Sequence, residues 1–307
     1  MKWYDVNDVR CFYGGQESID FYNRQLRERR SRYPRDWVDR YPAVAAQLEE
    51  KGYCVLRNAF DTETLYRLRT EVEAALQEPR LLKKNDANMQ MIGHPLLNLP
   101  TALEIAFDDL LADIATSYFH CLPGVGTVNM RKSFVNDLPP VETMLWHSDK
   151  NAHRFLKFFL YLNDVDLDGG PFTYMEGSHK LKFEGWLDKY RWSHEEIVAT
   201  YGEERLRYLT AKVGDVVIAD TTGFHRGSKP QRRERLMYTV DYGIHVELGS
   251  GTKRFDSDKR FHIAEEDFQA LPPHKRPLAD FLRTVPRART ADANRALLAH
   301  AARLTWE

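Results

Sequence analysis

The residues best suited to chemistry are histidines that precede an acidic residue by two positions. Roughly 1.6 such pairs are expected by chance in a chain with 11 His and 45 acidic residues, so the spacing alone identifies no site. On a β-strand, however, residues two apart point to the same face and can hold one metal ion together. The chain has three such pairs: His147 with Asp149, His194 with Glu196, and His245 with Glu247.

The sequence around each pair separates them. His147 and Asp149 follow the strand-like segment ETMLW. The pair at 194 and 196 falls in a predicted helix, where residues two apart diverge, and we interpret it as surface charge. The pair at 245 and 247 closes the last predicted strand and is interpreted as structural. The first pair is therefore the candidate metal site.

A third ligand is predicted well downstream of this pair. The segment GDVVIADTTGFHRG reads as a strand and a turn that deliver His225. Two histidines and one carboxylate form the facial triad of non-haem Fe(II) sites, which leaves about three positions on one side of the metal for a chelating cosubstrate and O₂.

An arginine just after this histidine is the candidate anchor for a cosubstrate. If the cosubstrate is 2-oxoglutarate, its distal carboxylate needs a partner, and the planar fork of arginine pairs bidentately with a carboxylate. Arg235 heads the apolar strand Leu236 to Val240 and can point into the fold. Arg233 shares its parity and competes for the role, while Arg232 is predicted to face water. The alternative is that all three lie on an exposed turn.

The first 124 residues are predicted to be mainly helical. Charged helices are expected at 16–31 and 43–51, followed by a strand within 52–60. Asp61 offers an N-cap to a helix whose apolar residues recur at helical spacing, and 101–120 reads as another amphipathic helix.

From residue 125 to 247 the pattern is that of a β-sandwich or barrel, because short runs rich in Val, Phe, Tyr and Thr alternate with turns. An insertion at 180–210, with a capping box of Ser193 and Glu196, is a possible lid. Residues 248–307 are predicted to be a helical extension of the same single domain. The expected strands are 126–135, 143–149, 155–162, 171–175, 214–219, 223–227 and 234–245.

The composition is that of a globular protein, with 43% hydrophobic and 29% charged residues. Lys and Arg (44) balance Asp and Glu (45), so no nucleic-acid or membrane partner is indicated. No signal peptide or membrane-spanning run is recognised, and a cytoplasmic location is expected. The three cysteines have no metal-binding or disulfide spacing and are predicted to be buried thiols.

Several of these motifs, taken in order, resemble the phytanoyl-CoA dioxygenase (PhyH) family of iron- and 2-oxoglutarate-dependent oxygenases. The similarity spans roughly residues 50 to 245. Its motifs are KGYCVLRNAFDTETLYRLRTEVE, WHSD, FFLYLNDVDLDGGPFTYMEGSHK, GDVVIADTTGFHRG, and Arg235 with its strand.

The resemblance implies an α+β fold with a mainly β core, a double-stranded β-helix (jelly roll, cupin-like) with N-terminal and C-terminal helices packed around it. It also implies that His147, Asp149 and His225 bind Fe(II) and that Arg235 grips the distal carboxylate of 2-oxoglutarate. Three other residues are implied at the cosubstrate: an aromatic residue, Phe159, and the polar residues Arg131 and Asn129.

Other positions of the family pattern imply less. Ser148 stands where many members have Gln, but its side chain should point away from the metal. Gly227 replaces a serine that touches the cosubstrate in several members, and Ser228 has the wrong parity to substitute. His179 is interpreted as a structural histidine of a turn.

The implied activity is hydroxylation of an unactivated C–H bond of a small metabolite or natural-product intermediate, with release of succinate and CO₂. Asp149 argues against halogenation, since related halogenases lack this carboxylate. The alternatives are a zinc hydrolase with the same ligands, which has no use for Arg235, and a non-catalytic barrel that binds a small molecule. The candidate substrate contacts are Met91, His94, Trp186 and Trp192.

Overall fold

Two antiparallel sheets form the centre of the protein. The computed structural model describes residues 3–5, 15–33, 39–150, 153–244 and 262–285. The larger sheet has seven strands in the order β2-β10-β6-β12-β5-β4-β3. In that order the strands are Tyr53–Leu56, Val216–Asp220, Phe155–Tyr161, Arg235–Gly243, Gly124–Ser133, Met89–Ile92 and Leu82–Asn85.

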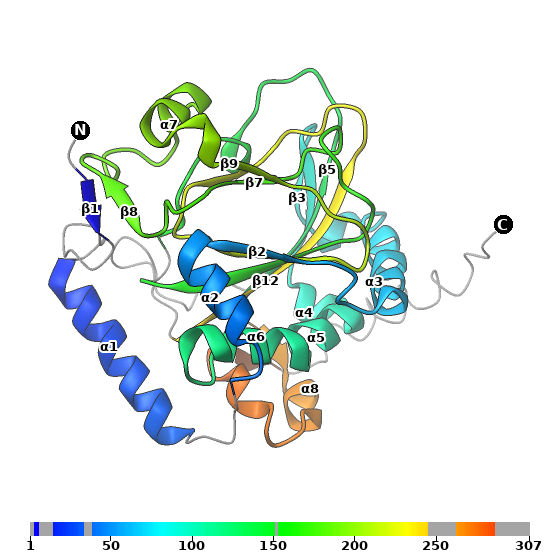
Figure 1. Cartoon of the computed structure of the whole chain (residues 1–307). Coiled ribbons are helices and arrows are strands. Elements are labelled where there is room, and N and C mark those ends of the chain that lie inside the picture. Colours follow the sequence, from blue (N-terminus) through cyan, green and yellow to red (C-terminus); the bar gives the residue numbers. More distant parts are fainter. Residues whose placement is uncertain (1–2, 6–14, 34–38, 151–152, 245–261, 286–307) are drawn as a thin grey trace.

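The smaller sheet lies above the larger one in Figure 1. It consists of β11 (His225–Gly227), β7 (Phe172–Met175) and β9 (Leu206–Leu209) in that order. Two short pairs lie outside both sheets. The strand β1 (Trp3–Asp5) pairs with β8 (Leu181–Phe183), and β13 (His262–Ala264) runs parallel to β14 (Arg283–Val285).

Helices cover the opposite face of the larger sheet, below it in Figure 1. No helix of the described residues is both long and apolar enough to cross a membrane. The helices on this side are α1 (Gly15–Arg32), α2 (Pro42–Lys51), α3 (Thr62–Ala75), α4 (Pro95–Asn98), α5 (Pro100–Ala106), α6 (Asp109–Phe119) and α8 (Glu265–Ala270). The helix α7 (His194–Tyr201) lies on the other side, above β9 in the figure.

Side chains along the central strands alternate between the main core on one face of the larger sheet and the space between the two sheets on the other. Successive side chains of a strand point to opposite faces. On β6, Leu156, Phe158 and Leu160 face the helices and are buried in the main core. The next strand, β12, sends Tyr238 and Tyr242 to the same side, where their hydroxyls donate to backbone carbonyls of α5. The other face of these strands looks toward the smaller sheet and carries polar side chains.

Most of the predicted elements are confirmed. Six of the seven expected strands coincide with β5, β6, β7, β10, β11 and β12 within two residues at either end. Asp61 caps α3 by accepting from two backbone N–H groups, and Ser193 and Glu196 form the predicted capping box of α7. The predicted helix 101–120 is wrong in one respect. It is two helices, because Asp108 accepts a hydrogen bond from the Leu110 amide and starts α6 anew.

The expected strand 143–149 is also wrong. A 3₁₀ turn, Glu142–Met144, is followed by an extended segment that forms only isolated bridges, at Trp146 and His147. The strands β3 and β4, which lie in the part predicted to be mainly helical, were missed.

Two other regions differ from expectation. The insertion 180–210 ends in β9, which pairs with β7 and so belongs to the smaller sheet. The described part of the C-terminal region, residues 262–285, holds two strands and two short helices, whereas the sequence predicts a helical extension over 248–307. Residues 286–307, as well as His245 and Glu247, lie outside the described residues.

Candidate metal centre

His147, Asp149 and His225 meet between the two sheets, as the spacing predicted. The Nε2 atom of His147 lies 3.8 Å from Oδ1 of Asp149, and that of His225 lies 3.7 Å from Oδ2. Backbone hydrogen bonds of 3.0 and 2.8 Å between the two histidines join the extended segment to β11 and fix this arrangement. The potential ligand atoms all lie within 4.8 Å of one another, which suits one metal ion.

The histidine rings are oriented by their backbone contacts. Nδ1 of His147 is 2.8 Å from the Leu145 carbonyl, and Nδ1 of His225 is 2.9 Å from the Gly223 carbonyl. A carbonyl only accepts, so each Nδ1 carries the proton and each Nε2 presents a lone pair toward Asp149. Both rings are thereby set as neutral ligands.

The charges of the site favour the ligand forms. Burial lowers the pKa of His147 well below its usual value and that of His225 to about 4, so both rings are neutral at pH 7. Burial opposes ionisation of Asp149, but Lys157, followed by the two histidines, holds its pKa below the usual range. Two neutral imidazoles and one carboxylate on one side are the donor set of a facial Fe(II) site, so the residues fit the metal.

Lys157 is a member of the site that the sequence analysis missed. Its Nζ donates to Oδ2 of Asp149 at 3.0 Å and lies 3.6 Å from Oδ1 of Asp241. The hydroxyl of Thr127 donates to the other oxygen of Asp241. A lysine within the apolar run FLKFFLY, at the parity of Phe159, is the sequence signal that could have found it.

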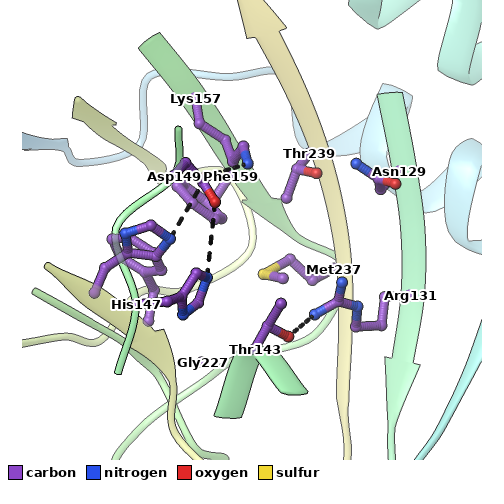
Figure 2. A pocket seen from close by; sticks show the side chains of 12 residues that line it. Asn129, Arg131, Thr143, His147, Asp149, Lys157, Phe159, Gly227, Met237 and Thr239 are labelled. Atoms are coloured by element: carbon purple, nitrogen blue, oxygen red, sulfur yellow. Dashed lines mark hydrogen bonds and ion pairs between the residues drawn. The ribbon is translucent and has the colours of Figure 1, made fainter. Parts of the chain in front are cut away.

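The triad forms one wall of a pocket (Figure 2), with Thr239 and Asn129 opposite and Arg131 and Met237 below them in the view. The predicted residues Phe159, Asn129 and Arg131 therefore line the same space as the triad. The lining residues are Asn129, Arg131, Thr143, His147, Asp149, Lys157, Phe159, Phe172, His225, Gly227, Met237 and Thr239.

Arg235 lies at the edge of this pocket, directly behind Gly227. Its side chain is 2% exposed, and it donates to the Ser228 carbonyl at 3.0 Å and to Ser133 Oγ at 3.4 Å. A Cβ atom at position 227 would lie 3.0 Å from Nη2 of Arg235, so the glycine leaves room for the guanidinium. The Ser228 hydroxyl contacts Thr173 instead, in agreement with its predicted parity.

The other two arginines of this segment are on the surface. Arg233 pairs with Asp166, and Arg232 lies 3.7 Å from Asp168. Both are more than half exposed, whereas Arg235 forms no ion pair with any described carboxylate. Of the three, only Arg235 lies next to a residue that lines the pocket, Gly227.

The four candidate substrate contacts do not line the pocket. Trp186 and Trp192 pack with Trp146 and Phe224 in a separate apolar cluster. Met91 packs with two other methionines, and His94 precedes α4 in a left-handed conformation. The role of 180–210 as a lid stays a prediction.

The residues interpreted as structural have ordinary partners. His179 is buried, with Nε2 3.1 Å from the Glu49 carbonyl. Ser148 donates to the Thr222 carbonyl, on the side away from the metal ligands. His194 stacks on Trp146, and Glu196 pairs with Lys189, so the second histidine pair is indeed no metal site. Cys54 and Cys121 are free and buried, as predicted.

Comparison with protein-family models shows which family the chain belongs to. The family model described as phytanoyl-CoA dioxygenase (PhyH) matches residues 48–233. The chain belongs to this family. The matched range includes the whole triad and ends two residues before Arg235. A search of the curated proteins finds no match.

Solved structures share the fold at low sequence identity. The epimerase SnoN, crystallised with Fe³⁺, alpha ketoglutarate and nogalamycin RO, superposes with a TM-score of 0.54 at 17% identity, covering 66% of this chain and 82% of that one. HygX from Streptomyces hygroscopicus with nickel and 2-oxoglutarate gives 0.53 at 16%, covering 70% and 92%. EctD from S. alaskensis with bound Fe gives 0.54 at 20%, covering 72% and 85%.

These findings confirm the predicted double-stranded β-helix and the PhyH resemblance. Membership of this family makes the protein an enzyme of the iron- and 2-oxoglutarate-dependent oxygenase superfamily, and its His-Asp-His triad could hold the metal ion that such an enzyme needs.

Proposed function

We propose that this PhyH enzyme hydroxylates an unactivated C–H bond of a small metabolite or natural-product intermediate. The overall reaction consumes substrate, 2-oxoglutarate and O₂ and yields the alcohol, succinate and CO₂. The observation that carries the proposal is the triad of neutral His147, ionised Asp149 and neutral His225 on the wall of a pocket, with the buried Arg235 at its edge.

Each residue has a defined task in this proposal. The triad would hold Fe(II), which supplies the oxidising chemistry when 2-oxoglutarate and O₂ bind. Arg235 would pair with the distal carboxylate of 2-oxoglutarate, since its guanidinium is enclosed and has no carboxylate partner among the described residues. Phe159 and Asn129 line the same pocket and would shape the cosubstrate's surroundings.

Hydroxylation is one of several outcomes that this chemistry can give. The similar structures include an epimerase and a carbocyclase, and those activities belong to those proteins. A carboxylate at position 149 favours hydroxylation over halogenation, because it occupies the coordination position that a halide would need. A zinc hydrolase with the same ligand set is disfavoured, because the chain belongs to the PhyH family and a hydrolase would leave Arg235 without a task.

The test is the anaerobic addition of Fe(II) and 2-oxoglutarate, watched for the visible charge-transfer band of the chelated complex. We expect the band in the wild-type protein, its loss in Asp149→Ala, and a raised 2-oxoglutarate requirement in Arg235→Ala but not in Arg233→Ala. A wild-type protein without the band would refute the oxygenase proposal. With a substrate in hand, incorporation of one atom of ¹⁸O₂ into the product separates hydroxylation from epimerisation and ring closure.

A further inference from the structure

The inner face of the larger sheet carries more cations than its carboxylates neutralise. Lys157 is shared by Asp149 and Asp241. Arg131 and Arg235 lie on the same face, and neither forms an ion pair with a carboxylate of the described residues. An unpaired charge in an enclosed site is costly, so such cations usually mark the position of an anion that binds there.

Of these two arginines, Arg131 is the one that lines the pocket. One of its terminal nitrogens donates to Thr143 Oγ1 at 2.7 Å, and its enclosed Nε has no hydrogen-bond partner. The nearby Glu142 is paired with Lys84 at 2.6 Å instead of forming an ion pair with Arg131. Burial is the main cause that lowers the pKa of Arg131 to about 10, and the positive charge of Arg235 is the next. A bound anion would stabilise the charged guanidinium.

A charge count separates the cosubstrate from the substrate, and it rests on the proposed function. Fe(II) and the 2-oxoglutarate dianion cancel. Three cations, Lys157, Arg131 and Arg235, then face two carboxylates, Asp149 and Asp241, which leaves one positive charge.

The strand register places the two arginines at different depths. Arg235 lies opposite Ser133, whereas Arg131 lies opposite Met237, two residues further along β12. Two residues of a strand span roughly 7 Å, so the guanidinium groups can serve different anions. Figure 2 shows Arg131 across the pocket from the metal ligands His147 and Asp149.

Sequence alone groups Arg131 with the cosubstrate. The charge count and the register favour another assignment. We propose that the substrate is a small molecule with a carboxylate that pairs with Arg131, while Arg235 holds the distal carboxylate of 2-oxoglutarate. Thr143, whose hydroxyl oxygen accepts from Arg131 in the pocket, supplies a further polar group for the same carboxylate.

The first measurement asks which arginine serves the cosubstrate. The charge-transfer band is titrated with 2-oxoglutarate in Arg131→Gln, Arg235→Gln and the control Lys132→Gln, whose side chain pairs with Glu234 on the opposite face of β5. We expect the half-saturating concentration to rise about tenfold or more in Arg235→Gln and to change less than about threefold in the other two. An equal rise in Arg131→Gln would overturn the proposal.

The second measurement asks whether the pocket prefers an anion. Trifluoroacetate and its uncharged counterpart trifluoroacetamide are added to the protein with Mn(II) and saturating 2-oxoglutarate, and the ¹⁹F relaxation caused by Mn(II) is compared with a Zn(II) blank. We expect enhanced relaxation of the acid but not of the amide. It should be lost in Arg131→Gln, partly kept in Arg131→Lys and unchanged in Lys132→Gln, with thermal melts confirming that each variant is folded.

The outcomes are distinguishable. Equal relaxation of acid and amide, or relaxation of the acid that survives Arg131→Gln, would overturn the carboxylate subsite and leave the oxygenase proposal intact. The absence of the charge-transfer band in the wild-type protein would instead remove the proposed function, and the subsite with it.

Discussion

The side chains on the two faces of the central strands have different roles. On β6, Phe158 faces the helices and is fully buried among apolar side chains, while its neighbour Lys157 faces the pocket and pairs with Asp149. On β12, the Tyr238 hydroxyl donates a hydrogen bond to the Ala102 carbonyl of α5, while Thr239 lines the pocket. One face is therefore built for stability and the other for binding, and alternation by one residue assigns each side chain to its task.

This division has a physical basis. Apolar side chains gain free energy simply by leaving water, so the helix-facing side can be closed completely. The charges of the pocket-facing side are tolerated only when partners or ligands compensate them. The division predicts that substitutions on the two faces have separable effects on ligand binding and on stability.

The largest effect is expected from removal of the triad carboxylate. Asp149→Ala leaves two neutral imidazoles and no anionic ligand, so the protein should no longer bind Mn(II). Electron paramagnetic resonance measures this binding. The surface variant Asp168→Ala should bind one ion as the wild-type protein does, because Asp168 lies in an exposed turn. Wild-type affinity in Asp149→Ala would mean that the triad is not the metal site.

The next effect concerns the helix-facing side. Leu160 is fully buried in the main core, and Leu160→Ala should lower the free energy of unfolding by about 2–5 kcal/mol. Urea denaturation of the metal-free protein measures this. The folded Leu160→Ala variant should still give the charge-transfer band, with the same half-saturating concentration of 2-oxoglutarate as the wild-type protein. A changed concentration would show that the two faces are coupled.

Lys157→Met tests the one pocket residue that should also affect stability. It leaves Asp149 and Asp241 without their shared ammonium, and we expect a loss of about 1–3 kcal/mol, less than for a fully buried pair because the pocket admits water. Mn(II) supplies positive charge at Asp149, so it should raise the melting temperature more in Lys157→Met than in the wild-type protein. An equal rise would argue against an electrostatic role for Lys157.

The sequence predicts residues of the site best where a regular strand carries them. Arg235 lies on β12, whose alternation is readable from the chain, and Asn129, Arg131 and Phe159, which the family resemblance implied, lie on β5 and β6. His147 and Asp149 were also found, although the segment that carries them is not a strand. There the two-residue spacing succeeds because isolated bridges keep the segment extended.

What the sequence did not reveal depends on contacts between distant segments. Lys157 meets Asp241 only because β6 and β12 are neighbours in the sheet, and Thr143 meets Arg131 only through the turn before the triad. Trp186 and Trp192 were placed at the pocket because large aromatic side chains suit a binding site. The same side chains equally suit an apolar cluster, and that is where they pack.

The last effect is the response of the metal-free protein to acid. His147 and His225 have pKa values lowered by burial, to about 4 for His225, against 6.5 for an ordinary histidine. The unfolded chain therefore binds more protons between pH 6.5 and 4, and stability is lost as the pH falls through this range, by at most about 1.4 kcal/mol per pH unit for each histidine. The helix-facing side titrates in the opposite sense. Burial raises the pKa of Tyr238 well above 10, so its contribution is lost only in strong base.

Urea midpoints in EDTA at several pH values test this difference. His225→Gln should flatten the dependence between pH 6.5 and 4, because it removes one of the groups that the unfolded state protonates. Tyr238→Phe, which loses a hydrogen bond to the Ala102 carbonyl, should lower stability equally at every pH in this range. If the urea midpoint of His225→Gln depended on pH as steeply as that of the wild-type protein, the acid sensitivity would have to come from residues outside the triad. The two faces would then not differ in their response to acid as we expect.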